Sequence, residues 1–181
     1  MAVSVSHSTR QKRAGEVDGV DYHFISMQQF EVMIDDNAFI EYARVFDNYY
    51  GTSRNAIEML LNSDRDIILE IDWQGAQQVK QKMPETVSIY ILPPSRTVLK
   101  QRLMARATDD PSIIARRMQA ADREMSHYND AEYLVINENF KQALYDLECI
   151  IHSQRMRLMR QKIRNRALID SIPQEIASMQ F

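Results

Sequence analysis

The stretch DIILEIDWQGAQQVKQK, residues 66–82, joins a near-continuous apolar run to a helical pattern. Asp66–Ile71 has the length of a strand, and Ala76–Lys82 has the composition and spacing of a helix. Strands that are apolar on both faces are typical of parallel sheets covered by helices on both sides. The stretch therefore predicts one unit of an α/β fold.

The same alternation continues toward the C-terminus. Val87–Leu92 (VSIYIL) and Tyr133–Ile136 (YLVI) are further apolar runs of strand length. Helical patterns follow at Ser95–Arg106 and Pro111–His127, and a last helix is predicted from Phe140 past Arg160. Strands that alternate with helices predict a parallel sheet flanked by helices.

The first third of the chain has a different pattern. Ala2–Ser6 and Tyr22–Ile25 alternate like short strands, and Phe39–Phe46 alternates over a longer run. A helix is predicted at Ser26–Asp35, and Ser53 is placed to cap the start of another. This region therefore mixes short strands with helices, in contrast to the regular alternation that follows it.

Composition sets the broad class of protein. The chain has 181 residues, of which 45% are hydrophobic and 26% charged, with a formal net charge of −3. This fits one domain with an inserted lobe, and no apolar run reaches the roughly 18 residues of a membrane span. The single cysteine, Cys149, is expected in the core. We expect a cytoplasmic protein that binds neither membrane nor nucleic acid, with homo-oligomer formation left open.

A basic run near the C-terminus, Arg155–Arg166, holds six basic residues and no acidic one. Such a run is typical of a solvated helix face, and cations near a helix C-terminus also favour its dipole. The alternative is nucleic-acid binding, although few aromatic residues are interleaved with the charges.

The first candidate binding cluster follows the first strand and contains Ser6, Arg10 and Arg13. Ligands of open α/β sheets bind beyond the carboxyl ends of strands. Two guanidinium groups at this spacing can clamp a phosphate through bidentate hydrogen bonds. The alternative interpretation is a solvated basic loop.

The second cluster combines Glu41 with the run YYGT, residues 49–52. The tyrosine and threonine hydroxyls offer a polar rim for a nucleotide, with Gly51 allowing close backbone approach. Glu41 shares a strand face with apolar residues, which is costly for a carboxylate without a partner. A carboxylate can accept from the ring N–H and the exocyclic amino group of guanine, whereas adenine offers no such pair.

The third cluster places Glu70 and Asp72 after an apolar strand, just before Gly75. These carboxylates can hold a magnesium-bound phosphate or form structural ion pairs with the arginines of the first cluster. Downstream, a set of arginines suits a lid that closes over transferring phosphates, or simply a charged helix face. The set is Arg102, Arg106, Arg116 and Arg117.

Taken in order, five segments resemble bacterial guanylate kinase, which phosphorylates GMP with ATP and magnesium. The segments are SVSHSTRQKRAGEVDGVDYHF, FIEYARVFDNYYGTS, ILEIDWQGAQQVKQKMP, IYILPPS and YLVIN. The resemblance implies a P-loop-kinase-like parallel sheet, with core segments 1–8, 63–95 and 128–181. It also implies an inserted, mixed α/β GMP-binding lobe at 9–62 and a helical lid at 96–127.

The resemblance also implies roles for individual residues. The GMP-binding positions are Ser6, Arg10, Arg13, Tyr22, Glu41, Tyr50, Thr52 and Glu70. Arg10, Arg117 and Asp72 fall on catalytic positions. Arg102, Arg106, Arg117 and Asn137 fall on positions that meet ATP, which would bring Mg²⁺ with it as the cofactor. No resident metal site is expected.

One family motif is missing from these 181 residues. Family members carry a central strand and a G-x-x-G-x-G-K-(S/T) loop before the segment that here begins at Ala2. None of Gly15, Gly19, Gly51 and Gly75 is followed by Lys-Ser or Lys-Thr. We therefore expect very low turnover by these residues alone. For the sheet we expect a gap, a borrowed strand, or a chain whose start was assigned or cut too late. The alternative function is a non-catalytic guanylate-kinase-like module that binds GMP or a phosphopeptide.

Overall fold

The computed structural model describes residues 1–63, 65–105 and 111–178, excluding the side chains of 111–113, 116–117 and 173–178. The chain forms two compact units. Unit 1 comprises Met1–Ser88 and Ala120–Ala131, and unit 2 comprises Ile89–Gln119 and Glu132–Phe181. The predicted division into core, GMP-binding lobe and lid remains a prediction.

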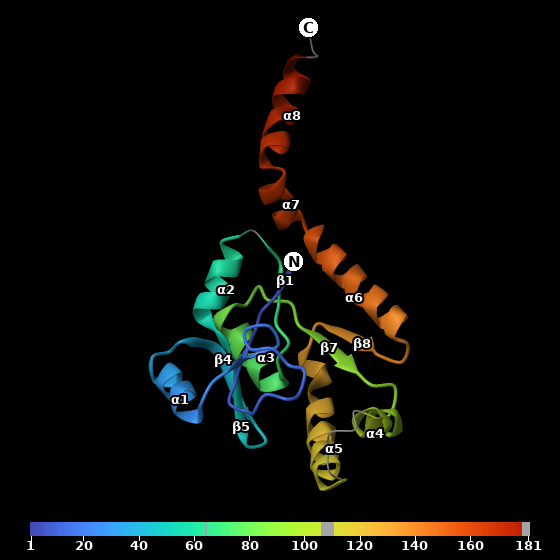
Figure 1. Ribbon diagram of the computed structural model, residues 1–181. Helices are drawn as coiled ribbons and strands as arrows, with labels where there is room; N and C mark the ends of the chain where they lie inside the picture. The colour runs from blue at the N-terminus through green and yellow to red at the C-terminus, as the bar shows by residue number, and fades with distance from the viewer. Residues whose placement is uncertain (64, 106–110, 179–181) are drawn as a thin grey trace. The chain divides into compact units, whose positions relative to one another are not determined.

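The elements of unit 1 mix short strands with three helices (Figure 1). They are β1 (Ala2–Val3), β2 (His7–Ser8), β3 (His23–Phe24), α1 (Met27–Asp35), β4 (Phe39–Val45), β5 (Asn48–Ser53), α2 (Arg54–Leu61), β6 (Ile67–Ile68) and α3 (Trp73–Lys82). The end of α5 (Pro111–Met125) and a 3-10 helix (Ser126–Asp130) also belong to this unit.

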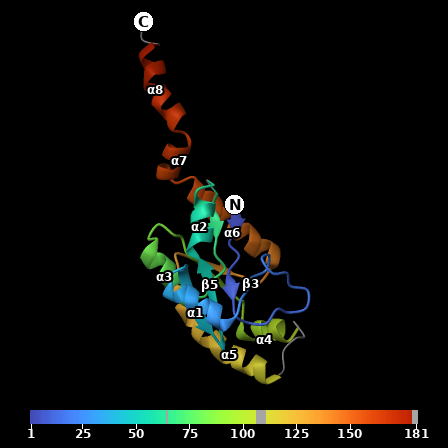
Figure 2. The ribbon, with the colours of Figure 1, turned by 60° about the vertical axis from the view of Figure 1, so that its left-hand side comes forward.

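A four-stranded sheet in the order β3-β2-β5-β4 carries the predicted lobe. Strand β2 runs parallel to β3 and antiparallel to β5, and β4 and β5 form an antiparallel hairpin. Helix α1 lies against β5 (Figure 2). Its Phe30 is fully buried and stacks on Phe39 and Tyr49, with ring centroids 4.3 and 5.1 Å away.

Local signals fixed both helices of this lobe as predicted. Ser26 and Gln29 form a capping box at the start of α1. Ser53 caps α2 by accepting from the backbone of Ala56. Below the sheet, α3 packs against β4 through a small apolar core of Ile40, Ile57 and Val79. This core fixes the start of α3 close to the middle of β4.

The parallel strand pairing predicted from the apolar runs is found in the described part of the chain. Strand β1 pairs only with β6, and β7 (Ile89–Leu92) pairs only with β8 (Tyr133–Ile136), so two separate parallel pairs result. The run at Asp66–Ile71 forms a strand over only two residues, because β1 is equally short and a ladder extends only as far as its partner.

Unit 2 contains β7, α4 (Arg96–Ala105), the start of α5, β8, α6 (Phe140–Arg155), α7 (Leu158–Arg164) and α8 (Arg166–Ser178). The long last helix predicted from Phe140 past Arg160 is corrected to three helices. It breaks because Arg157 adopts an extended backbone with φ −57° and ψ 136°. The prediction that Cys149 lies in the core is also wrong, since Cys149 is exposed on α6.

Candidate functional site

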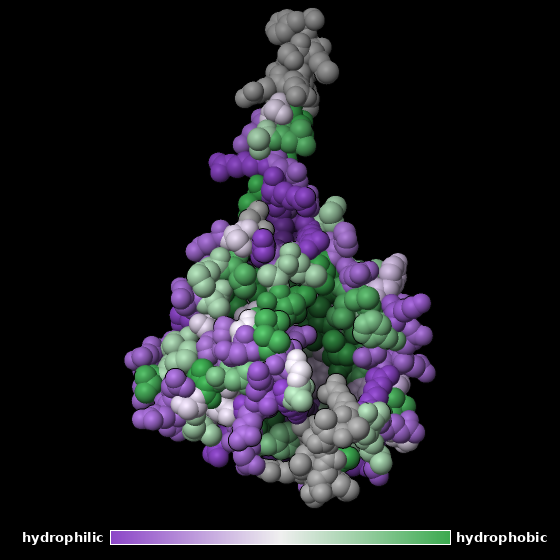
Figure 3. All heavy atoms as spheres, viewed as in Figure 1, coloured by the Kyte–Doolittle hydropathy of each residue, from purple (hydrophilic) through white to green (hydrophobic). Residues whose placement is uncertain are grey.

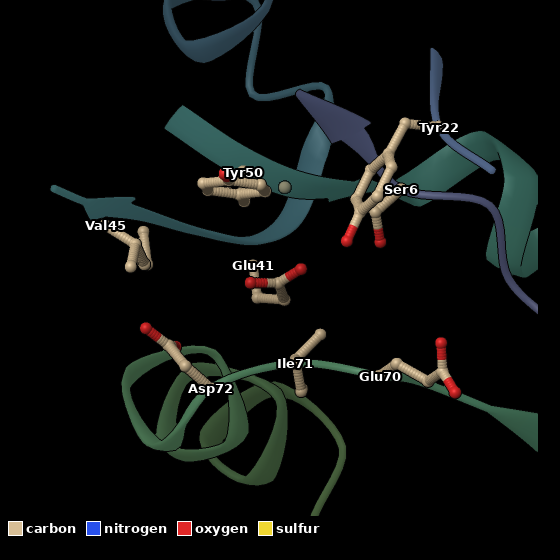
Figure 4. Close-up of a pocket in the computed structure, with 10 residues that line it drawn as sticks. Ser6, Tyr22, Glu41, Val45, Tyr50, Glu70, Ile71 and Asp72 are labelled. Atoms are coloured by element: carbon tan, nitrogen blue, oxygen red, sulfur yellow. The ribbon is translucent and has the colours of Figure 1, made fainter. Parts of the chain in front are cut away.

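A cavity of about 190 Å³ lies in unit 1 between the hairpin β4–β5 and the segment that leads into α3 (Figure 4). Six predicted site residues line it, namely Ser6, Tyr22, Glu41, Tyr50, Glu70 and Asp72. Glu41 lies at its centre, with the hydroxyls of Ser6 and Tyr22 on one side and Asp72 on the other (Figure 4). The fold therefore brings together residues that are up to 66 positions apart.

A chain of hydrogen bonds forms one wall of the cavity. The Thr52 hydroxyl donates to Glu41 Oε1 at 2.5 Å, and Ser6 Oγ lies 3.2 Å from Thr52 Oγ1. Thr52 is fully buried and Glu41 is 3% exposed. Because the only hydroxyl proton of Thr52 goes to Glu41, Ser6 must donate to Thr52. Ser6 Oγ then presents its lone pairs, so both ends of the chain act as acceptors.

Burial changes the acidity of Glu41. Loss of solvent raises the pKa of its carboxyl, and the charge of Asp72 raises it further, while the hydrogen bond from Thr52 opposes the shift. The charge of Lys82 also opposes the shift. A ligand that donates a hydrogen bond to the carboxylate would stabilise its ionised form.

Gly75 lies directly beneath the Glu41 carboxylate. A Cβ at position 75 would stand 2.5 Å from Glu41 Oε2 and 3.1 Å from its Cδ. Any larger residue would therefore push the carboxylate away. The sequence showed only a glycine at the start of a helix. The close approach of Gly75 to the Glu41 carboxylate results from the packing of α3 on β4, which the sequence does not reveal.

Asp72 has a structural task in addition to lining the cavity. It is the N-cap of α3, and its Oδ1 accepts from the Gly75 amide at 2.9 Å. Beside it, the Trp73 ring stacks on His127 with centroids 3.7 Å apart and an interplanar angle of 6°. This stack joins the end of the predicted lid to the start of α3, a contact that sequence reasoning missed because the two residues are distant in the chain.

The predicted phosphate clamp has a partner that was not foreseen. Arg10 forms a bidentate ion pair with Glu16, with both N–O distances at 2.6 Å. Its guanidinium also lies 4.9 Å from the Tyr22 ring centroid. Glu16 accepts hydrogen bonds from the Arg10 side chain and from the Arg13 backbone, and these lower the pKa of Glu16 to about 2. The suggested pairing of these arginines with Glu70 or Asp72 is thus wrong for Arg10, because Glu16 is nearer along the loop.

Neither Arg10 nor Arg13 is among the residues that line the cavity. Arg10 reaches the rim through the Tyr22 ring, which in turn lies edge-on to the Tyr50 ring at 6.0 Å. Gly51 lines the cavity, but the side where its Cβ would point is filled by Phe30 and Tyr42. Its small size therefore serves the aromatic packing of the lobe as well as the cavity.

The residues predicted to meet ATP are partly described, all of them in unit 2. The Arg102 guanidinium donates to the backbone carbonyl of Asn137 at 2.8 Å, so α4 and the end of β8 meet there. Arg106 and the side chain of Arg117 lie outside the described residues. A structural role for Arg102 in joining α4 to β8 is compatible with this contact.

Two further findings concern metal ligands and membrane-spanning helices. Within the described ranges, no three side chains of His, Cys, Asp or Glu gather as metal ligands would. Among the residues described, no helix has the length and apolar character required to cross a membrane.

Comparison with known proteins agrees with the fold. A sequence model of the family described as Guanylate kinase matches residues 1–154. The guanylate kinases of Escherichia coli (strain K12) and Methylococcus capsulatus (strain Bath) are 53% and 54% identical, over 94% and 93% of this chain and 82% and 83% of theirs. A solved guanylate kinase from Anaplasma phagocytophilum superposes with a TM-score of 0.76 at 33% identity, covering 87% of this chain and 78% of that one. The α/β fold is therefore P-loop-kinase-like, and the chain belongs to the guanylate kinase family.

Proposed function

We propose that the cavity of unit 1 binds GMP as phosphoryl acceptor, and that ATP with Mg²⁺ is the phosphoryl donor of the family reaction, giving ADP and GDP. This would place the protein in purine nucleotide metabolism in the cytoplasm. The observation that carries the proposal is the buried chain Ser6–Thr52–Glu41. It ends in two acceptors, Ser6 Oγ and the Glu41 carboxylate, on residues that line the cavity.

Guanine fits this wall better than adenine does. Guanine presents a ring N–H and an exocyclic amino group side by side, and Glu41 Oε2 and Ser6 Oγ can accept from them. Adenine presents an acceptor at the equivalent ring nitrogen, which would face the Glu41 carboxylate. Leaving buried polar groups unpaired in this way costs about 1–3 kcal/mol each.

Arg10 is oriented to take the GMP phosphate. Glu16 occupies the end of the guanidinium formed by Nη1 and Nη2, and Nη1 also donates to the Gln11 carbonyl at 3.1 Å. The side formed by Nε and the second Nη2 proton is the other bidentate edge of the group. In this proposal Glu16 holds Arg10 in place while that edge, with Arg13 and Tyr50, binds the phosphate.

The donor half of the reaction rests on fewer residues. Arg102, Arg106, Arg117 and Asn137 would meet ATP, Asp72 would face the magnesium-bound phosphates that ATP brings, and Glu70 would line the GMP side. The 181 residues contain no glycine followed by Lys-Ser or Lys-Thr. Phosphoryl transfer depends on a backbone nest and its lysine, so we propose that these residues alone bind GMP but turn over slowly.

Calorimetric titration of the purified chain with GMP, AMP and guanosine tests the acceptor site. We expect GMP to bind at least about tenfold more tightly than AMP, which corresponds to about 1.4 kcal/mol. Equal affinity for GMP and AMP would contradict the assignment of Glu41. ADP formation from ATP and Mg²⁺, measured with and without GMP, tests the proposed slow phosphoryl transfer. Rapid GMP-dependent turnover would contradict the proposed dependence on the missing loop.

A further inference from the structure

A stack of two aromatic rings connects the segment after α5 with the start of α3 in unit 1. The rings of Trp73 and His127 lie 3.7 Å apart at an interplanar angle of 6°, and both residues are half-buried. His127 belongs to the 3-10 helix Ser126–Asp130, which directly follows α5. Helices α1 and α2 present hydrophilic side chains among hydrophobic ones at the surface (Figure 3), whereas the two rings of the stack cover each other. The stack therefore joins two segments that are distant in the chain.

The orientation of the His127 ring is set within its own helix. Its Nδ1 lies 3.2 Å from Asp130 Oδ2. Because a carboxylate only accepts hydrogen bonds, Nδ1 carries a proton and donates it to Asp130. The imidazole is thus held at one edge by Asp130 while its face lies on the indole of Trp73.

Trp73 is the first residue of α3 and follows the N-cap Asp72 directly. Both carboxylate oxygens of Asp72 accept hydrogen bonds from this first turn. Oδ1 accepts from the Gly75 amide at 2.9 Å, and Oδ2 accepts from the side chain of Gln74 at 3.2 Å. The position of the first turn therefore fixes both Asp72 in the wall of the cavity and Gly75 beneath the Glu41 carboxylate.

The middle of α3 is fastened to the strand that carries Glu41. The side-chain amide of Gln78 accepts from the backbone N–H of Tyr42 at 3.2 Å and donates to the Tyr42 carbonyl at 2.7 Å. Val79 is buried in the small core between α3 and β4. Gln78 and Val79 thus anchor the middle of the helix, and the stack with His127 holds its first turn.

The end of α5 lies near the same turn, as the acidity of Glu124 shows. Burial and, to a lesser extent, the charge of Asp72 raise the pKa of Glu124 in the last turn of α5. The charge of Asp72 also contributes to the raised pKa of Glu41. A displacement of the first turn of α3 would therefore alter the ionisation of Glu41 as well as the space beneath it.

We propose that His127 is a positioning residue of the GMP site and acts through Trp73. Its stack fixes the first turn of α3, and with it the distance between Gly75 and the Glu41 carboxylate. This role rests on the proposed binding of GMP in the cavity, where Glu41 reads the base. The segment after α5 then sets how tightly guanine is held without touching it.

Calorimetric titration with GMP, guanosine and AMP tests this role. His127→Ala removes the stacked ring, and we expect GMP and guanosine affinity to fall by the same factor, about tenfold, while AMP affinity changes little. The two losses should be equal because the contact to the base is disturbed and the contact to the phosphate is not. His127→Gln, which also lacks an aromatic ring, should give the same loss, whereas His127→Phe keeps a stacking ring and should restore wild-type affinity.

The matched control is Tyr128→Ala. Tyr128 is the next residue of the same 3-10 helix and is 40% exposed. We expect this variant to bind GMP as the wild type does, because it leaves the stack in place.

The fluorescence of Trp73 gives a readout that a loss of stability alone would not change. Trp73 is the sole tryptophan of the chain, so its emission reports on the stack. An imidazole stacked on an indole quenches the indole emission. His127→Ala and His127→Phe should therefore both emit more strongly than the wild type in the free protein, although only His127→Ala binds GMP weakly.

The wild-type affinities separate a failure of this role from a failure of the proposed function. A wild type that binds GMP no more tightly than AMP would overturn both. A wild type that prefers GMP, together with His127→Ala and His127→Gln variants that bind GMP equally well, would overturn the role of His127 alone. A loss of affinity that His127→Phe does not restore, or that Tyr128→Ala shares, would also overturn it.

Discussion

At the scale of single residues, Glu41 is the group on which the proposed specificity depends. Its carboxylate is buried, it is held by Thr52, and its pKa is raised by burial. Glu41→Gln keeps the size of the side chain but replaces one acceptor oxygen by an amide donor, which would face the guanine donors. We expect GMP affinity to fall about tenfold or more while AMP affinity changes little.

The same group gives GMP binding a pH dependence that titration calorimetry at several pH values can check. A protonated Glu41 would carry an O–H donor that can face the guanine donors. Affinity should therefore rise with pH through the raised pKa of Glu41 and then level off. Glu41→Gln should lose that dependence. A wild-type affinity that does not vary between acidic and neutral pH would show that Glu41 does not contact the base.

Arg10 carries the second residue-scale prediction. Arg10→Lys keeps the charge but loses the planar fork that binds Glu16 and a phosphate at the same time. We expect GMP affinity to fall about tenfold and guanosine affinity to stay unchanged. Lys12→Arg, on the exposed part of the same loop, is the control. An equal loss for GMP and guanosine would mean that Arg10 supports the fold and not the phosphate.

At the scale of elements, the pairing of β2 with β3 places two histidines side by side. His7 stands opposite His23, with ring centroids 4.7 Å apart, and its buried Nδ1 has no hydrogen-bond partner. Burial and, to a lesser extent, the charge of His23 lower the pKa of His7 to about 4, while the charge of Asp18 opposes the shift. A proton on His7 would therefore disrupt this part of the sheet.

Acid should destabilise the lobe for this reason. The pKa of His7 is 6.5 in the unfolded chain and about 4 in the folded chain. Between these pH values the unfolded chain binds more protons, so the free energy of unfolding falls as the pH drops from 6.5 to 4. His7→Phe should remove up to roughly 3 kcal/mol of this loss at pH 4. Urea unfolding at pH 7 and pH 4 measures it, with the exposed His152→Phe as control. The same pH dependence in wild type and His7→Phe would contradict the assignment.

Elements with strong local signals were predictable and elements that depend on a partner were not. Ser26 and Ser53 mark the starts of α1 and α2 as helix caps do anywhere. Strand β6 is shorter than its apolar run because the length of a strand depends on its neighbour. The helix break at Arg157 could not be predicted, because no proline or glycine stands near it in the sequence. Glu41 and Ser6 could be predicted as binding residues from the sequence. The ion pair of Glu16 with Arg10 could not, because it depends on the conformation of the loop.

At the scale of the whole molecule, we expect GMP to protect backbone amides from hydrogen exchange in one unit and not in the other. All residues that line the cavity belong to unit 1, whereas β7, β8 and α6 belong to unit 2. Hydrogen exchange should therefore show GMP protecting the amides of β4, β5 and the first turn of α3. The amides of β7 and β8 should exchange at the same rate with and without GMP. Equal protection in both units would mean that GMP couples them.

Gly75 also constrains how this sequence can change. Since a Cβ there would strike the Glu41 carboxylate, position 75 has no neutral alternative while Glu41 reads guanine. In a library of all substitutions selected for GMP capture, Gly75 should tolerate none, whereas Gln77, exposed on the same helix, should tolerate most. Replacing Glu41 by a smaller residue should relax the restriction, so that the fitness cost of a substitution at position 75 depends on which residue occupies position 41.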